Sequence, residues 1–552
     1  MITKKWIYKE GNAVKNFLAS KGFNTKEEAS AYLNFDKSQL RTNYLDMDKV
    51  VNRIADAIEN KENITIYGDY DCDGICGTSI MLLALRRIGV NANFFINNRF
   101  SEGYGMNENG VARLIEKFPE TELIVTVDNG IAAQLGIKAA LDAAIDVVCT
   151  DHHLQKGDII VPTVDEWRVD EDENAREESC GAEIARRTML ALYKKLNRPQ
   201  IDLQFIDDLI TFSGIATVAD VVKFTAANRC IVKICIDYLN NPVFPIINLI
   251  KNEMRLDDID EETLGFKLGP LMNCLSRVTG SPDEMVEILT SERNSIETYE
   301  KVRNAVETNE TRKKMSDENF ETAMFEINDL DECIILSGDY DPGIAGLVCS
   351  SVVERYNKPC ICLHEEDGIL KGSARSFLNF HLKEALDKCA DLLIGYGGHA
   401  GAAGLTLREE NLEAFQERMN TLVKESGILD SEVNINIDYK CSVSDMYDET
   451  VQALMSLAPF GEGFEKPKIV YTGGYKTVSF TPKDAETPKH VSLTLKDKTG
   501  ECKAVWWNSY DKWTTLNPAS KAELEIMGAP HIDFFNDKYY RKLYVDDIRI
   551  KE

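Results

Sequence analysis

Four separated segments of the chain place Asp or His side chains directly after apolar runs. They are GDYDCDG with Asp69, Asp71 and Asp73, VDNG with Asp128, TDHH with Asp151, His152 and His153, and ATVADVV with Asp220. Carboxylates mixed with one or two imidazoles suit Mn²⁺ or Mg²⁺ better than zinc, which more often binds thiolates. If these groups meet, they repel one another strongly unless cations lie between them. Two such ions can clamp the attacking and leaving oxygens in phosphoryl transfer.

The alternating Asp residues of GDYDCDG, followed by Gly74, also resemble the start of a calcium-binding EF-hand loop. That loop requires Glu at its twelfth position, which is Ile80 when the count starts at Asp69. It also requires a preceding helix, where this sequence predicts a strand. We therefore interpret the segment as a turn at the end of a strand, with Gly74 allowing a sharp exit into the next helix.

The elements that must position these residues alternate between strand and helix. ENITIYGD, ELIVTVDNG and IDVVCTDHH each predict a short strand that ends at Asp or His, and TSIMLLALRRIG has the spacing of an amphipathic helix. This alternation predicts a parallel α/β sheet, in which ligands bind at the carboxyl ends of the strands. The acidic turns after these three strands would then lie at one edge of the sheet.

The 552 residues are enough for several domains, and patterns along the chain predict five parts. A second strand–helix–strand pattern begins at ECIILSGDYDPG, and from Asp438 the short alternating runs predict a small β-barrel. The charged stretch before the second pattern is interpreted as a solvated helix that connects two lobes. The predicted parts are a helical lead-in (1–45), an α/β lobe with the acidic turns (46–230), a helical connector (231–330), a second α/β lobe (331–430) and the barrel (431–552).

The net charge of −28 argues against a polyanionic partner for the average surface. The charge is uneven, because residues 438–552 hold 18 Asp+Glu and 16 Lys+Arg, a net of only −2. Non-specific binding to a long polyanion should therefore be weak, and any capture by a local basic site should fall steeply with salt. The 14 cysteines form no CxxC pair, and no apolar run or leader sequence indicates a membrane or export. We expect a cytoplasmic protein with no membrane partner.

The four acidic segments, in this order, resemble the metal motifs of the DHH phosphoesterase family, and more closely its RecJ branch of single-strand-specific exonucleases. NRFSEGYG, LGPLMNCLSR, KGSARS and GYGGHAGAAGL extend the resemblance towards the C-terminus. It implies that residues 46–230 form a DHH catalytic domain and residues 331–430 a DHH-associated substrate-binding domain. It also implies that the barrel is an OB-fold that binds single strands.

The resemblance also implies roles for individual residues. The position at which many DHH phosphatases have a metal-binding His is Tyr67 here, and Asp69 can take its place. The implied ligands of two Mn²⁺ or Mg²⁺ ions are Asp69, Asp71, Asp73, Asp128, His152 and Asp220, and the implied catalytic residues are Asp69, His153 and His399. A pocket for the 5′-phosphate and the strand would use Arg99, Arg277, Ser373, Arg375, Gly397, Gly398 and His399.

OB-fold barrels hold single strands by stacking bases on aromatic side chains within a basic groove. The candidates here are Trp506, Trp507 and Tyr540, with Lys and Arg residues nearby. Because side chains alternate along a strand, about half of the barrel's aromatic residues should instead lie in its core.

Together these features predict a metal-dependent exonuclease that degrades single-stranded DNA from the 5′ end to mononucleotides, in DNA repair or recombination. A helicase or a single-strand-binding protein is an expected partner. Two alternatives stay open at this point. One is a DHH phosphodiesterase for short oligonucleotides or cyclic dinucleotides, although such chains generally lack the barrel. The other is a non-catalytic replication scaffold, although a scaffold has no reason to keep a full set of metal ligands.

Overall fold

The structure is a computed structural model that describes residues 3–291, 295–328, 330–482, 488–519, 522–535 and 538–551. Its contacts divide the chain into two compact units. The first contains Gln39–Val222 and Cys230–Ser431, and the second contains Thr3–Ser38, Lys223–Arg229 and Glu432–Glu552. The expected division into five parts stays a prediction, and each unit is described by itself.

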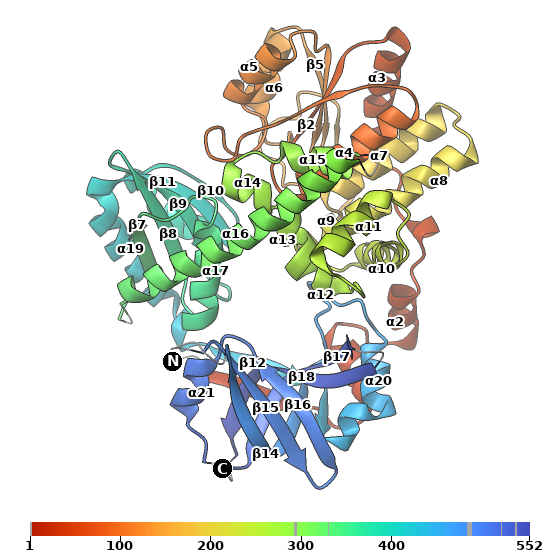
Figure 1. Cartoon of the computed structure of the whole chain (residues 1–552). Helices are drawn as coiled ribbons and strands as arrows, with labels where there is room; N and C mark the ends of the chain where they lie inside the picture. The colour runs from red at the N-terminus through yellow and green to blue at the C-terminus, as the bar shows by residue number, and fades with distance from the viewer. Residues whose placement is uncertain are drawn as a thin grey trace. The chain divides into compact units, whose positions relative to one another are not determined.

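The first unit begins with a five-stranded parallel sheet in the order β3-β2-β4-β5-β6 (Figure 1). The parallel α/β architecture expected for the acidic segments is confirmed. Two short strands, β3 and β6, have too few residues to give a sequence pattern. The strands are β2 (Ile64–Gly68), β3 (Asn93–Ile96), β4 (Leu123–Val127), β5 (Asp146–Thr150) and β6 (Thr163–Val164). The accompanying helices are α3 (Met47–Asn60), α4 (Cys72–Arg87), α5 (Glu108–Lys117), α6 (Gln134–Asp142) and α7 (Gly181–Lys195).

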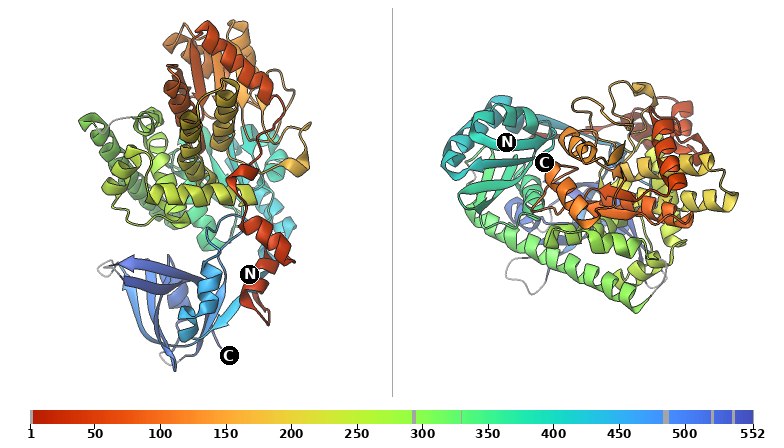
Figure 2. Two further views of the ribbon diagram at one scale, coloured as in Figure 1. Left: turned by 90° about the vertical axis from the view of Figure 1, so that its right-hand side faces the viewer. Right: turned by 90° about the horizontal axis from the view of Figure 1, so that it is seen from above.

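A helical segment follows and ends in the 31-residue helix α16 (Ile296–Glu326). Few of its residues are buried, among them Val302, Ala305 and Ala323, as expected for a solvated connector. Figure 2 shows α16 in green, running towards the second lobe. The preceding elements are α8 (Gln200–Asp208), α9 (Ile210–Ala219), α10 (Ala226–Asn240), α11 (Pro245–Met254), α12 (Glu261–Thr263), the π-helix η3 (Leu264–Leu268), α13 (Gly269–Met272), α14 (Cys274–Thr279) and α15 (Asp283–Leu289).

The second lobe of this unit is a mixed five-stranded sheet in the order β10-β11-β9-β8-β7. Only β7 and β8 pair in parallel, and the remaining pairs are antiparallel. Its strands are β7 (Ile334–Gly338), β8 (Cys360–Glu366), β9 (Ile369–Arg375), β10 (Leu393–Gly398) and β11 (Ala402–Arg408), with helices α17 (Ala345–Tyr356), α18 (Leu382–Asp387) and α19 (Leu412–Ser426).

The second unit contains the predicted barrel, which closes because β14 pairs with both β15 and β17. Its core consists of alternate strand residues such as Leu493, Leu495, Ala504 and Trp506. The strands are β13 (Tyr439–Cys441), β14 (Ile469–Thr481), β15 (His490–Asp497), β16 (Gly500–Trp506), β17 (Leu524–Phe535) and β18 (Lys538–Ile550), and the helices are α20 (Glu449–Met455) and α21 (Tyr510–Leu516).

The N-terminal segment differs from the expected helical lead-in. It contains α1 (Ala13–Ser20) and α2 (Lys26–Leu33), but it begins with strand β1 (Thr3–Tyr8), which pairs in parallel with β12 (Glu432–Ile437). Phe17 of α1 is fully buried, with its ring centroid 5.3 Å from that of Phe464. The lead-in is therefore part of the barrel unit, because its apolar residues complete that unit's core.

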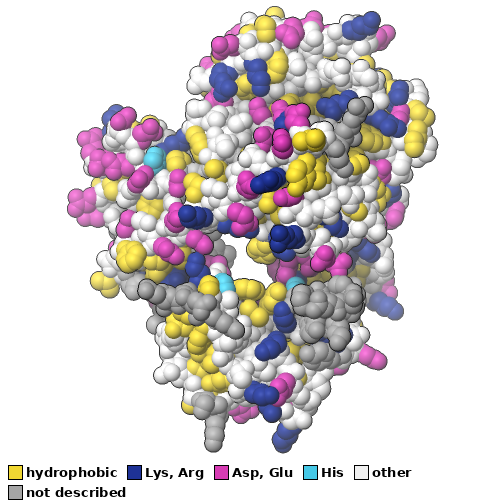
Figure 3. All heavy atoms as spheres, in the orientation of Figure 1, with side chains coloured by type: hydrophobic (Ala, Val, Ile, Leu, Met, Phe, Trp, Pro, Cys, Tyr) yellow, Lys and Arg dark blue, Asp and Glu magenta, His cyan; other side chains and the backbone are white. Residues whose placement is uncertain are grey.

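Charged side chains are distributed unevenly over the surface. On the face drawn in Figure 3, Asp and Glu side chains gather at the outer edge of the lobe that contains α19, while Lys and Arg predominate on the visible barrel strands. Among the described residues, no single helix has the length and apolar composition to cross a membrane. Only α10 and α11 pass that test when counted as one pair, and they are bent by 77°.

Candidate metal centre and anion pocket

The turn after β2 carries the first three carboxylates. Helix α4 begins earlier than its sequence pattern suggests, at Cys72, because Asp71 caps it: Asp71 Oδ1 accepts hydrogen bonds from the backbone N–H of Asp73 (3.0 Å) and Gly74 (3.2 Å). A Cβ atom on Gly74 would lie 2.4 Å from the carbonyl oxygen of Asp69. Gly74 therefore lets the first turn of α4 pack directly against the backbone of Asp69, which agrees with the predicted sharp exit from the strand into the helix.

The other ligands follow β4, β5 and α9. Asp128 adopts a left-handed backbone conformation (φ 61°), and His152 follows Asp151 at the end of β5. The first turn of α7 completes the arrangement, because the N–H groups of Gly181 and Ala182 donate to Asp73 Oδ2 and Oδ1 at 2.6 and 2.7 Å. These bonds hold Asp73 in a single orientation.

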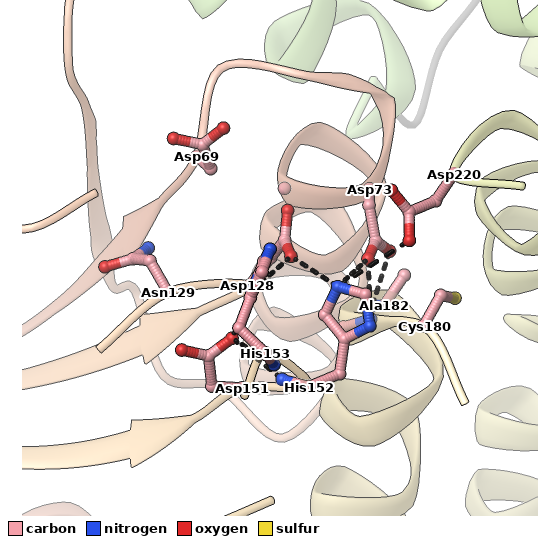
Figure 4. A network of polar contacts seen from close by, with 12 residues as sticks. Asp69, Asp73, Asp128, Asn129, Asp151, His152, His153, Cys180, Ala182 and Asp220 are labelled. Atoms are coloured by element: carbon pink, nitrogen blue, oxygen red, sulfur yellow. Dashed lines mark hydrogen bonds and ion pairs between the residues drawn. The ribbon is translucent and has the colours of Figure 1, made fainter. Parts of the chain in front are cut away.

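The structure brings all six predicted ligands together. Figure 4 shows the ring of His152 between Asp73, Asp128 and Asp220. His152 Nε2 lies 3.3 Å from Asp73 Oδ2, 3.0 Å from Asp128 Oδ1 and 3.7 Å from Asp220 Oδ2. Three groups have ligand atoms within 4.8 Å of one another: Asp69–Asp71–Asp128, Asp73–His152–Asp220 and Asp128–His152–His153.

These residues fit divalent cations, as their hydrogen bonding shows. In the described part of the chain, Asp69 Oδ2, Asp128 Oδ1 and His152 Nε2 are buried and make no hydrogen bond of acceptable geometry, although His152 Nε2 and Asp128 Oδ1 lie 3.0 Å apart. Buried polar atoms normally have a well-oriented partner, so three such atoms that converge on one place indicate an ion. Asp128 and His152 each belong to two of the three groups, so the groups adjoin one another, as a pair of neighbouring ions would require.

Electrostatics lead to the same conclusion. Burial and the neighbouring carboxylates raise the pKa of Asp69, Asp128 and Asp220 well above the usual range, because several negative charges share a small volume. Burial lowers the pKa of His152, which favours the neutral imidazole that binds metals. Bound cations would reverse the repulsion and keep the carboxylates ionised.

Tyr67, at the position of the missing His, lies away from this cluster. Its side chain is fully buried in the core, and its hydroxyl donates to Asn97 Oδ1 at 2.5 Å. Asp69 occupies the metal turn instead. This geometry supports the expectation that Asp69 takes the place of the missing imidazole.

His153 lies beside the ligands and is held by two contacts. Its Nδ1 lies 2.8 Å from Asp151 Oδ1, and the hydroxyl of Tyr104 lies 3.1 Å from the ring. Burial opposes the charged form, but the charge and hydrogen bond of Asp151, together with the charges of Asp220 and Asp69, outweigh it and raise the pKa of His153 to about 10. His399 is exposed on the turn between β10 and β11. Partial burial, followed by the positive charge of His153, lowers the pKa of His399.

The predicted phosphate-binding residues form a separate cluster within the same unit. A Cβ atom on Gly346, at the start of α17, would lie 3.0 Å from Arg375 Nη2 and 3.5 Å from Ser373 Oγ. Arg277 Nη1 donates to the carbonyl of Gly343 at 3.1 Å, and the Arg99 guanidinium lies 4.7 Å from the ring centroid of Tyr70. The start of α17 is thus the place where the side chains of Ser373 and Arg375 meet that of Arg277.

The charges of this cluster are unbalanced. Burial, followed by the charges of Arg99, Arg312 and Arg375, lowers the pKa of Arg277 to about 9. In the part of the chain that the structure describes, no carboxylate forms an ion pair with Arg99, Arg277 or Arg375. Guanidinium groups gathered in this way are suited to a phosphate. Sequence reasoning missed Arg312, because it lies in the charged stretch that reads as a solvated helix.

Gly397 and Gly398, the two predicted glycines of the β10–β11 turn, differ in whether the fold requires glycine at their position. Gly398 has φ 140°, and a Cβ atom there would lie 2.4 Å from the carbonyl oxygen of Ala402, so only glycine fits. A Cβ atom on Gly397 would meet nothing within 4 Å, so the fold does not require glycine there.

On the barrel, the prediction that Trp506 stacks on a base of the strand is wrong. Trp506 points into the core and is 5% exposed, because it follows the inward alternation of β16, and it cannot stack on a base. Trp507 is 51% exposed. The side chain of Tyr540 lies outside the described residues. Sequence reasoning missed His490 and Tyr544, whose ring centroids lie 4.8 and 6.1 Å from that of Trp507, and His531, which stacks on Tyr544 at 4.2 Å.

Models of three protein families match the chain in order. They are the N-terminal domain of the DHH family (residues 63–212), the DHHA1 domain (331–425) and the RecJ OB domain (437–547). The fold and the carboxylate site thus define a protein of the DHH class.

Curated relatives narrow this class. The single-stranded-DNA-specific exonuclease RecJ of Bacillus subtilis (strain 168) is 31% identical over 560 residues, covering 98% of this chain and 68% of the relative. RecJ of Escherichia coli (strain K12) is 30% identical over 461 residues, covering 76% of this chain and 77% of the relative. The chain belongs to the RecJ family.

Solved structures agree with this assignment. RecJ of Thermus thermophilus in complex with Mn²⁺ matches 100% of this chain and 80% of its own, with a TM-score of 0.81 and 21% identity. An exonuclease RecJ bound to manganese matches 71% of this chain and 100% of its own, with a TM-score of 0.61 and 25% identity. The first likeness supports the fold as a whole.

Proposed function

We propose that the protein is a metal-dependent exonuclease that degrades single-stranded DNA from the 5′ end and releases 5′-mononucleotides. The observation that carries this proposal is the convergence of six candidate ligands from four segments on one site, where three of their buried atoms make no well-oriented hydrogen bond within the described part of the chain. Asp69, Asp71 and Asp128 would hold one Mn²⁺ or Mg²⁺ ion, and Asp73, His152 and Asp220 a second. Bound there, such ions supply an activated water and stabilise charge on the leaving oxygen.

The protein's own residues orient the strand. The Arg99–Arg277–Arg375 cluster with Ser373 would hold the terminal phosphate, because no carboxylate among the described residues forms an ion pair with these arginines and guanidinium forks match phosphate oxygens. His153 would contact the scissile phosphate from the side of Asp151, which keeps its imidazole charged and oriented. His399 would approach from the exposed β10–β11 turn, whose left-handed Gly398 brings the backbone close to the nucleotide.

The barrel would hold the unpaired strand. A row of rings is formed by His490, Trp507, Tyr544 and His531. Lys503 lies opposite Lys542 on the adjacent strands β16 and β18. Rings and cations in this combination bind single strands with little sequence preference. The names of the relatives, which are single-stranded-DNA-specific exonucleases, support this choice of substrate.

Substrate preference tests this proposal. With Mn²⁺ present, a 5′-phosphorylated single strand should be degraded much faster than a blunt duplex of the same sequence. Arg375→Ala should raise KM for the 5′-phosphorylated strand and abolish its advantage over a 5′-hydroxyl strand. Arg408→Ala, which changes an exposed arginine of neighbouring β11, serves as the control and should behave as wild type. Equal rates on single strand and duplex would refute the proposal.

The same assay covers the two alternatives. Turnover of a dinucleotide without turnover of a long strand would indicate a phosphodiesterase for small substrates. DNA binding without hydrolysis in Mn²⁺ would indicate a scaffold. The proposal includes three further predictions. The protein acts in repair or recombination, it receives the strand from a helicase or a single-strand-binding protein, and it is located in the cytoplasm.

A further inference from the structure

The short helix α14 connects the two clusters described above. Asn273 precedes it, Arg277 lies on its last turn, and Gly280 follows it with φ 82°. Each of these three residues makes a hydrogen bond to a different part of the site. The helix is therefore placed to set the spacing between the metal ligands and the arginine cluster.

Asn273 makes the contact to the metal turn. Its Oδ1 accepts a hydrogen bond from the backbone N–H of Cys72 at 2.9 Å, although the two residues are 201 positions apart in the chain. Cys72 is 2% exposed and is the first residue of α4, so its N–H has no partner within the helix. Asp71 Oδ1 is already bonded to the N–H groups of Asp73 and Gly74. Asn273 thus completes the capping of the turn that carries three metal ligands.

The other contacts of α14 reach the arginine cluster. Arg277 Nη1 donates to the carbonyl of Gly343, and the backbone N–H of Arg99 donates to the carbonyl of Gly280 at 2.8 Å. A Cβ atom on Gly343 would lie 1.9 Å from the carbonyl oxygen of Arg277, so the two segments are in direct contact. The position of α14 therefore fixes Arg277 and Arg99 at the same time.

We propose that Asn273 is a positioning residue that holds the metal turn in register with the arginine cluster. Through α14 it sets the spacing between the bound terminal phosphate and the metal ligands, and so determines that hydrolysis releases one nucleotide at a time. This inference rests on the proposed exonuclease function. Asn273 acts through the backbone of Cys72 and needs no contact with the substrate.

Three variants of the full chain test it. Asn273→Ala removes the acceptor, and Asn273→Asp keeps an oxygen at the same place. Asn240→Ala is the matched control, because Asn240 also ties the end of a helix to a distant segment, the loop before α12, with Oδ1 accepting from the N–H of Ile259 and Nδ2 donating to its carbonyl. In the described residues it makes no hydrogen bond to the metal turn. Mn²⁺ binding is measured from the electron paramagnetic resonance signal of the free ion, and product length on a 5′-phosphorylated strand by gel.

We expect Asn273→Ala to bind Mn²⁺ about 10-fold or more weakly, as is usual when a partner of the ligands is lost. It should lower kcat, leave KM unchanged and release dinucleotides together with mononucleotides. Asn273→Asp should restore Mn²⁺ affinity and product length, and Asn240→Ala should match wild type in both. If alanine prevents folding, Asn273→Leu, of similar volume, takes its place.

Wild-type Mn²⁺ affinity and product length in Asn273→Ala would overturn the inference, as would an equal loss in Asn240→Ala. If the wild type releases no nucleotides, the proposed function fails. The Mn²⁺ measurement would still test the positioning role of Asn273.

Discussion

Asp71 has two functions in the metal turn, since it belongs to a ligand group and also caps α4. Substitution by alanine removes both functions and should lower stability by about 0.5 to 2 kcal/mol through loss of the cap. Asp71→Asn keeps the capping oxygen but removes the charge. We expect Asp71→Asn to unfold at the wild-type denaturant concentration and to have no nuclease activity in Mn²⁺. Activity at the wild-type rate would show that Asp71 is not a ligand.

Val221, next to Asp220, has an unfavourable backbone conformation. It is β-branched with φ 56° and 64% exposed, and such a conformation costs about 1 to 3 kcal/mol. Val221→Gly should raise the free energy of unfolding by about 1 kcal/mol, because the relief of strain exceeds the entropy cost of glycine. Val243→Gly, at an exposed position with ordinary φ, should lower it. Denaturant titration of both variants distinguishes these signs, and a loss of stability in Val221→Gly would contradict the assignment of strain.

For individual residues, the sequence predicted which residue types could bind the metals, but not which other residues hold those side chains in place. Asp, His and Gly residues at strand ends indicated a metal site without any structure. The contact between Asn273 and Cys72 leaves no local pattern, because it joins residues 201 positions apart. Trp506 and Trp507 show the same limit, since adjacent aromatic residues on a strand point to opposite sides and the sequence does not say which one is buried.

The first turn of helix α7 makes two sets of charged contacts. Its N–H groups bind Asp73, and in the same turn the fully buried Glu183 accepts hydrogen bonds from Arg186 Nε and Nη2 (2.7 and 2.6 Å) and Arg187 Nε (2.7 Å). Burial opposes ionisation, but the two arginines outweigh it and lower the pKa of Glu183 to about 2. The folded pKa lies below the ordinary value, so this contribution to stability is complete above about pH 4.5 and is lost towards pH 2.

Glu183→Gln should therefore lower stability at pH 7 by about 1.5 to 3 kcal/mol, because it removes the buried charge that both arginines share, while Arg187 keeps Glu177 and Arg186 keeps Asp207 as partners. The difference from wild type should shrink as the pH falls from about 4.5 towards 2, where wild-type Glu183 also becomes protonated. Denaturant titrations at pH 7, 5 and 3 measure this difference. The control is Glu173→Gln, at an exposed site, which should have no effect. A difference that does not depend on pH would contradict the assignment.

The N-terminal helix α1 should stabilise the barrel unit. Phe17→Ala should lower that unit's stability by about 3 to 5 kcal/mol, because it empties a fully buried position between Phe460 and Phe464. Mn²⁺ binding in the other unit should be unchanged. Phe325→Ala, at a position 92% exposed, is the control. Thermal unfolding followed together with Mn²⁺ binding checks both statements, and weaker Mn²⁺ binding in Phe17→Ala would refute them.

Among the elements, the sequence predicted those with a clear period. The three apolar strands before the acidic turns, the long charged helix and the alternating barrel strands were found from their patterns. Strand β1 was missed because TKKWIY is short and polar, and its role depends on β12, more than 400 residues away. The start of α4 was placed too late because a capping Asp inside a metal motif does not have the appearance of a helix terminus.

For the whole molecule, the net charge of −28 was a poor guide to whether the protein binds DNA. Outside residues 438–552 there are 73 acidic and 47 basic residues, so nearly all of the negative charge lies away from the barrel. At least five of these acids converge on the metal centre, where bound cations would balance them. An acidic protein can thus act on DNA, because its local arginine cluster and near-neutral barrel would contact the strand.

Digestion of one oligonucleotide, labelled at either end, tests the central claim most directly. With Mn²⁺, the 5′-labelled strand should release its label as a mononucleotide at the earliest times, while the 3′-labelled strand shortens progressively. Chelation of the metal should stop both reactions. Early release of the 3′ label, internal fragments, or digestion that continues with chelator present would contradict the account.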